Sequence, residues 1–100
     1  MTIPIACDLS PDAVRAGRAG LLPGLAERAD RRDETQDGYL LTFQASSDVL
    51  RAIAATVDAE RQCCRWLRFV LTVEPDGGAI TLALSGPQGA REFLSALFGV

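Results

Sequence analysis

The feature that most constrains the fold is a pair of alternating segments near the end of the chain. In "LRFVLTVE" (67–74) and "AITLALS" (79–85), apolar residues recur at every second position, as in strands with one buried face. The four residues between them, "PDGG", are typical of a tight turn. The two segments therefore predict an antiparallel hairpin. Its predicted inward-facing residues are Leu67, Phe69, Leu71, Val73, Ile80, Leu82 and Leu84.

The first half of the chain predicts strands that alternate with helices. "IPIAC" (3–7) is short and apolar, as expected of a buried strand. A helix is expected to follow, because Ser10 is a favourable N-cap and Pro11 suits the first helical position. After a break at "LLPG", a second helical segment is expected over 23–32, and the charged "RADRRDETQDG" is expected to be its solvated end and a turn. "YLLTFQA" (39–45) predicts a strand.

Two further helices are predicted around the hairpin. "SSD" (46–48) offers N-caps for the longer helix, whose apolar stripe is Leu50, Ile53, Ala54 and Val57. "GPQG" (86–89) is a turn that leads into the last helix, whose apolar side is Phe93, Leu94, Leu97 and Phe98. The predicted order is β-α-β-α-β-β-α. We expect a single α+β domain over residues 1–100, a two-layer sandwich with a mixed sheet, a C-terminal hairpin and a final helix.

Composition narrows the classes of function. The formal net charge of -3 argues against binding to nucleic acid, which needs a basic surface. We find neither a secretory signal pattern nor an apolar run of the roughly 18 residues that span a membrane. We therefore expect a cytoplasmic protein that binds neither membranes nor nucleic acid. The chain has three cysteines and no histidine, so any metal site must use thiolates and carboxylates.

The double cysteine of "ERQCC" is the main candidate for chemistry. Continuing the stripe of the longer helix past Val57 brings Glu60 and Cys64 onto its inward face, because a helical face recurs every three to four residues. Cys63 lies within one turn of Glu60. Cys7 ends the first predicted strand, where it can meet the double cysteine. Converging thiolates select soft or borderline ions. We therefore predict a metal site made of Cys7, Glu60, Cys63 and Cys64.

Other interpretations of the same residues stay open. Free cysteines often pack as small apolar side chains, so all three can belong to the core. Glu60 can extend to the surface or pair with Arg65 or Arg68. A disulfide between adjacent cysteines is the least favoured arrangement, because it closes a very small ring.

Four segments resemble a group of small bacterial proteins of uncharacterised function. They are "ACDLSPDA", "ERQCC", "LRFVLTVEPDGG" and "LSGPQGAREFL", and the resemblance covers most of the chain. In that group a proline commonly follows the double cysteine, where this chain has Arg65. The resemblance points to the same four candidate residues and implies no role for them. The predicted order of elements also resembles the fold of small sulfur-carrier proteins, although "CDLSP" lacks their C-P-x-P motif.

The leading functional hypothesis is storage, buffering or delivery of a thiophilic ion such as Zn(II), Cu(I) or Hg(II). It favours a binding protein over an enzyme and names no catalytic residue. Such a role leaves two kinds of partner open. One is a second copy of the chain in a homodimer, and the other is a protein that donates the metal ion or accepts it. Two alternatives stay beside it: a thiol protein for sulfur transfer or redox chemistry, and a non-catalytic interaction module whose cysteines only pack.

Overall fold

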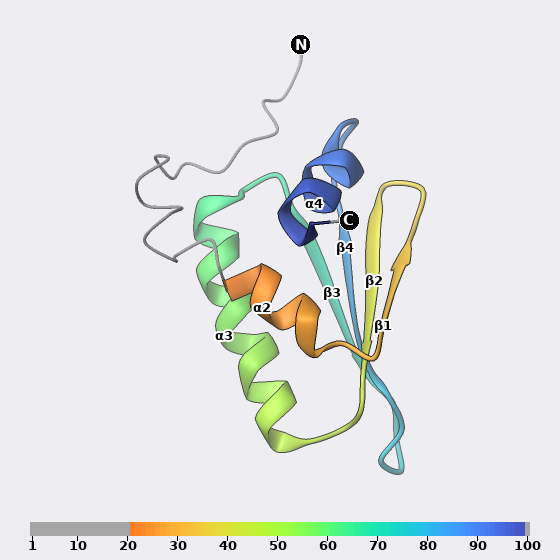
Figure 1. Cartoon of the computed structure of the whole chain (residues 1–100). Helices are drawn as coiled ribbons and strands as arrows, with labels where there is room; N and C mark the ends of the chain where they lie inside the picture. Colours follow the sequence, from red (N-terminus) through yellow and green to blue (C-terminus); the bar gives the residue numbers. More distant parts are fainter. Residues whose placement is uncertain (1–20, 100) are drawn as a thin grey trace.

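One four-stranded antiparallel sheet organises the protein, with the strands in the order β1-β2-β4-β3. It is seen in a computed structural model that describes residues 21–99 (Figure 1). The elements in chain order are α2 (Leu21–Arg28), β1 (Arg31–Glu34), β2 (Gly38–Phe43), α3 (Ser47–Cys63), β3 (Arg68–Val73), β4 (Ile80–Ser85) and α4 (Ala90–Phe98). The predicted strand 3–7 and the predicted helix from Ser10 lie outside the described residues, and so does Cys7.

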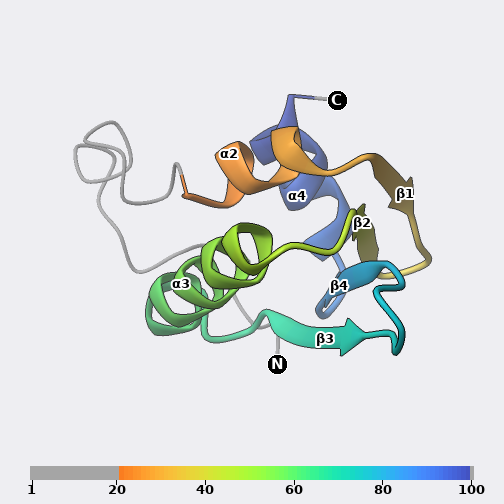
Figure 2. The same ribbon diagram turned by 90° about the horizontal axis from the view of Figure 1, so that it is seen from below.

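All three described helices cover the same face of the sheet, as Figure 2 shows. The alternation in β2 and β4 explains why. Tyr39, Leu41 and Phe43 are buried and face Leu84, Leu82 and Ile80 of β4 in register, while the residues between them are only partly buried. The α+β class and the hairpin of β3 with β4 are therefore confirmed, as is the inward face of β4.

The prediction was wrong for the segment before β2. Residues 31–34, which we expected to belong to a charged turn, form the edge strand β1 and pair with β2 from Arg31↔Thr42 to Glu34↔Tyr39. Their side chains carry no apolar alternation, because the strand is held through its backbone while its side chains meet solvent. The helix before it correspondingly ends at Arg28 instead of Arg32.

This extra strand changes the topology. The order over residues 21–99 is α-β-β-α-β-β-α, where we expected helices to separate the early strands. Every strand pairing in this range is antiparallel, so the parallel part of the expected mixed sheet is not found among the described strands. A direct hairpin connection between β1 and β2 is the unexpected part of this topology, whereas the β3–β4 hairpin and the helix before it are as predicted.

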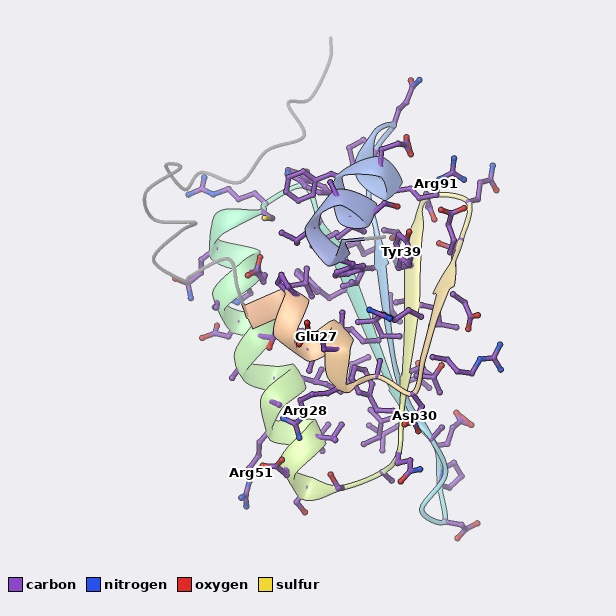
Figure 3. The ribbon with its side chains drawn as sticks, in the orientation of Figure 1. Glu27, Arg28, Asp30, Tyr39, Arg51 and Arg91 are labelled. Carbon is purple, nitrogen blue, oxygen red and sulfur yellow. The ribbon has the colours of Figure 1, made fainter. Side chains whose placement is uncertain are left out.

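The longest helix, α3, starts at the predicted cap. The Ser46 hydroxyl accepts a hydrogen bond from the Val49 backbone N–H at 3.0 Å, which satisfies one of the free donors of the first turn. Arg28 at the end of α2 forms an ion pair with Asp48 at 2.6 Å, and Figure 3 shows Arg28 beside the start of α3. Ala54, which we placed on the apolar stripe, is exposed, because the buried face runs through Ile53 and Thr56 instead.

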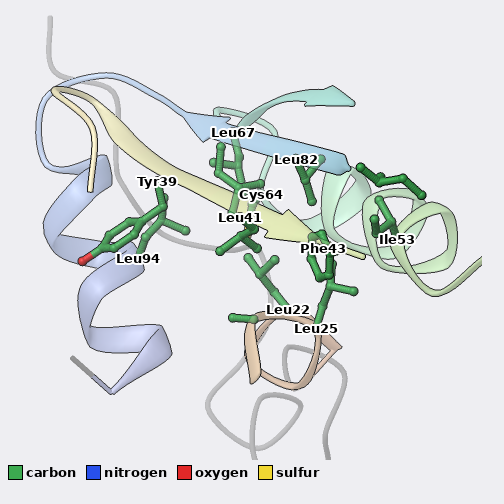
Figure 4. Packing of buried hydrophobic residues seen from close by; sticks show 13 residues of the cluster. Leu22, Leu25, Tyr39, Leu41, Phe43, Ile53, Cys64, Leu67, Leu82 and Leu94 are labelled. Carbon is green, nitrogen blue, oxygen red and sulfur yellow. The ribbon is translucent and has the colours of Figure 1, made fainter. Parts of the chain in front are cut away.

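The core lies between the sheet and the three helices. Figure 4 shows side chains from α2, α3, α4 and the sheet packed into one cluster, which includes Cys64. The predicted inner residue of the last helix, Leu94, is fully buried. Tyr39 anchors this helix twice: its ring meets Phe98 edge to face at 5.3 Å, and its hydroxyl shares a short hydrogen bond with Ser95.

The backbone of β4 lies close to Gly38 at the start of β2. A Cβ at this position would lie 1.7 Å from the Leu84 carbonyl oxygen, which is far inside van der Waals contact. Gly24 in α2 is the opposite case, because a Cβ there would meet nothing within 4 Å. The two glycines therefore allow a matched test of the sheet packing.

We predict that Gly38→Ala lowers the free energy of unfolding by about 1–3 kcal/mol, because β2 must shift to accept the methyl group. Gly24→Ala should raise it by roughly 0.5–1 kcal/mol, since alanine is the better helix former. Urea unfolding of both variants measures the difference. Equal stability of the two variants would contradict the described packing of β2 on β4.

Candidate thiol–carboxyl site

The end of α3 places Glu60 and Cys64 one helical turn apart. The Cys64 backbone N–H donates to the Glu60 carbonyl oxygen at 2.7 Å, which closes the last turn of the helix. Cys64 itself leaves the helical conformation with φ -108° and ψ 76°. The Leu67 N–H then donates to the Cys64 carbonyl at 3.0 Å, and this turn leads into β3. The backbone thus holds both side chains on the inner face of the helix.

Both side chains are buried, as the helical stripe predicts. Glu60 and Cys64 are each 1% exposed, and the Cys64 Sγ atom lies 3.8 Å from Glu60 Oε2. This distance is within the reach of a hydrogen bond that involves sulfur. In the reduced protein the Cys64 thiol can therefore donate to the carboxylate. The alternative that Glu60 extends into solvent is wrong.

The carboxyl group of Glu60 is held in a polar arrangement within the core. Among residues 21–99, no buried side-chain nitrogen or oxygen lacks a hydrogen-bond partner. An isolated buried carboxylate would cost several kcal/mol. Glu60 can therefore stay in the core only if its carboxyl oxygens have hydrogen-bond partners. The neighbouring Arg61 does not turn toward it, because Arg61 forms an ion pair with Asp58 at 2.8 Å on the exposed side of the helix.

The sulfur of Cys64 is disulfide-bonded in the structure, and its partner is not among the described side chains. In this state the sulfur carries no proton, so a proton between it and Glu60 has to come from the carboxyl group. The 3.8 Å contact is thus compatible with a thiol beside a carboxylate and with an oxidised sulfur beside a carboxylic acid.

Two of the four predicted metal ligands are brought together, Glu60 and Cys64. Cys7 and the side chain of Cys63 lie outside what the structure describes. Within the described part of the chain, no group of three or more cysteine, aspartate or glutamate side chains has the geometry to hold a metal ion. The proposed ligand set therefore keeps two residues whose positions are predictions.

An aromatic pair lies beside the turn that follows Cys64. The rings of Trp66 and Phe93 meet edge to face at 5.3 Å. A Cβ on Gly86 would come within 2.8 Å of the Trp66 ring and 2.9 Å of Ala90, so the start of α4 packs closely against this turn. The sequence patterns placed Phe93 on the apolar side of the last helix and did not predict its contact with Trp66. The small residues on both sides of "PQ" were the available signal.

Comparison with known proteins adds no relative. No protein family, no curated protein and no solved structure matches the chain. Among the described helices, none combines the length and the apolar character needed to cross a membrane. The candidate site therefore has to be judged from its own chemistry.

We predict that Glu60→Ala lowers the free energy of unfolding of the reduced protein by about 2 kcal/mol, because it leaves a cavity and unpaired partners in the core. Asp58→Ala is the matched control on the exposed side of the same turn, and it should change stability by no more than about 0.5 kcal/mol. Chemical unfolding under reducing conditions compares them. A loss for Asp58→Ala as large as for Glu60→Ala would contradict the burial of Glu60.

Proposed function

We propose that the protein binds a thiophilic metal ion at the end of α3, for storage, buffering or delivery. Cys64 and Glu60 are the donors that the described residues supply, and Cys63 and Cys7 are the proposed additional sulfurs. The observation that carries this proposal is the carboxyl group of Glu60, buried to 1% exposure, with the Cys64 sulfur 3.8 Å from it.

The chemistry of this pair favours a cation. Two groups that become anionic on deprotonation share an interior place where charge is poorly solvated, and a bound ion offsets both charges at once. Thiolate donors select soft and borderline ions. Three sulfurs and one carboxylate oxygen also make a tetrahedral set of the kind that Zn(II) prefers, and no histidine is needed for it. Zn(II), Cu(I) and Hg(II) are therefore the proposed ions.

Cys7 takes part only if the N-terminal segment returns to this corner. Residues 8–20 separate Cys7 from the start of α2, and α2 packs against α3. At roughly 3.3 Å per extended residue, this connection is long enough to reach the end of α3. In this proposal Cys7, at the end of the predicted segment 3–7, lies beside Cys64.

The proposal predicts that bound metal protects the thiols of the reduced protein from alkylation. Cys64→Ser, Cys63→Ser and Cys7→Ser should each weaken this protection, and Glu60→Gln should weaken the apparent affinity by roughly 10–100-fold. Asp58→Asn is the matched control and should behave as the unmodified chain, because Asp58 points away from the site. Alkylation rates are measured with Zn(II), Cu(I) or Hg(II) added in turn. Rates that stay unchanged with all three ions would contradict the proposal.

A second candidate function, dithiol redox chemistry, is favoured by the disulfide-bonded state of Cys64. A dithiol reductant would attack the sulfur bonded to Cys64 through its thiolate, and the breaking S–S bond would leave its electron pair on Cys64. The Glu60 carboxyl group would then protonate the Cys64 thiolate. The second thiol of the reductant would attack the mixed disulfide, close the reductant's own disulfide and release the former partner of Cys64 as a thiol. We rank this function second, because a sulfur that is 1% exposed is poorly accessible to exchange.

This second function predicts that Glu60→Gln slows reduction of the protein by a dithiol, since the amide has no proton of comparable acidity to give. The rate is measured by stopping the reaction at set times, alkylating the free thiols and separating the alkylated products by mass. Asp58→Asn should reduce at the original rate. Equal rates for Glu60→Gln and Asp58→Asn would exclude Glu60 as the proton donor.

A further inference from the structure

The two edges of the described sheet differ in a way that suggests a partner for one of them. The outer strand β1 is short and has the sequence "RRDE", so charged side chains protect its edge. The opposite outer strand, β3, has six residues, "RFVLTV", with neither proline nor bulge. Figures 1 and 2 show β3 at the margin of the sheet. Within residues 21–99 no strand pairs with this edge, and an edge of this kind is a template for pairing with another strand.

The backbone of β3 has hydrogen-bonding groups to offer along this edge. The Glu74 N–H donates to the Ala79 carbonyl at 3.3 Å, at the turn end of the hairpin. Because antiparallel strands alternate between inward and outward groups, the even-numbered residues of β3 bond to β4. The N–H and C=O groups of Phe69, Leu71 and Val73 therefore point away from β4, toward the outer edge of the described sheet.

Side chains along the same edge are apolar and exposed. Val70 is 42%, Leu71 43% and Val73 55% exposed, and they are the exposed large hydrophobic residues found in the described part of the chain. We expected Leu71 and Val73 to face the core. They do lie on the face covered by helices, opposite Leu82 and Ile80, but the helices do not extend over them. Leu71 and Val73 thus lie on one face of the sheet and Val70 on the other, so exposed apolar side chains flank this edge on both faces. We call residues 68–74 the β3 edge.

We propose that the β3 edge pairs antiparallel with the β3 edge of a second copy of this chain, about a two-fold axis at Leu71. In this register each residue faces the residue of the second copy that lies equally far from Leu71 on the other side. The facing side chains complement one another. The facing pairs are Leu71 with Leu71, Phe69 with Val73, Val70 with Thr72, and Arg68 with Glu74. The outward backbone groups of Phe69, Leu71 and Val73 face one another, so the two sheets join into one.

Charge complementarity selects this occupant and this register. Arg68 and Glu74 are both exposed, and they lie at opposite ends of the strand. The two-fold axis at Leu71 therefore brings each Arg68 opposite Glu74 of the second copy, which gives two ion pairs at the ends of an apolar centre. Moving the axis to Val70 would place Arg68 opposite Thr72 and remove both pairs. A second copy supplies the matching charges without any other partner.

The test is a charge reversal with rescue, followed by sedimentation velocity on the full chain. An edge pairing buries little surface, so we expect a dimer with a dissociation constant on the order of 10 µM. Arg68→Glu and Glu74→Arg should each weaken the dimer by about tenfold, because each turns two attractions into two repulsions. The double variant should return to within about threefold of the original affinity. Thermal unfolding at low concentration checks that the exposed substitutions leave the fold intact.

Amide hydrogen exchange distinguishes the second copy from the other occupant, the chain's own N-terminal segment. Pairing between copies predicts that the amides of Phe69, Leu71 and Val73 become more protected as protein concentration rises. Protection that does not depend on concentration would show that the same chain covers the edge. That result would overturn the proposal. A monomer at about 1 mM would overturn it too, as would a double variant no tighter than the single ones.

Discussion

The burial of the Glu60 carboxyl group is the constraint on which the rest of the account depends. An apolar side chain would fill this place at lower cost, since a carboxyl group in the core needs partners for its oxygens and for its charge. The Cys64 sulfur lies 3.8 Å away, and the backbone of Cys64 is bonded to the carbonyl of Glu60. The helix therefore delivers an oxygen donor and a sulfur donor to one interior point. Departures from the local rules of packing tend to occur where function requires them.

Periodicity predicted the helices and strands that bury one face in the core. The stripe of α3 continued from Ile53 to Glu60 and Cys64, and all three are buried. The hairpin of β3 and β4 likewise follows from alternation. Periodicity did not predict β1, because "RRDE" has no apolar face and its place in the sheet comes from backbone bonds to β2. Edge strands of this kind leave little trace in side-chain patterns.

Patterns also cannot say how far a neighbouring layer extends. Leu71 and Val73 lie on the inner face, as alternation predicted, yet they are 43% and 55% exposed because no described helix covers that corner. The same limit applies to the candidate site. Helical spacing joins Glu60 to Cys64, since the contact lies within one turn, whereas a contact between Cys7 and Cys64 depends on long-range packing that no local period encodes.

The candidate site and the β3 edge are neighbours along the chain. The turn after Cys64 is packed by Trp66 against Phe93, and β3 starts directly after it, at Arg68. A dimer through β3 would therefore place the ends of two α3 helices on one joined sheet, each with its own sulfur and carboxyl pair. Metal binding and pairing remain separable, because the residues that define the pairing register, Arg68 and Glu74, are exposed and belong to neither donor set.

Whether the end of α3 holds a metal ion is tested by the native mass of the reduced full chain, purified without chelators and then supplied with Zn(II), Cu(I) or Hg(II). We predict one bound ion per chain for at least one of the three metals, and no bound ion for Cys64→Ser. A bare chain mass after incubation with all three, or an ion that Cys64→Ser retains in full, would contradict it.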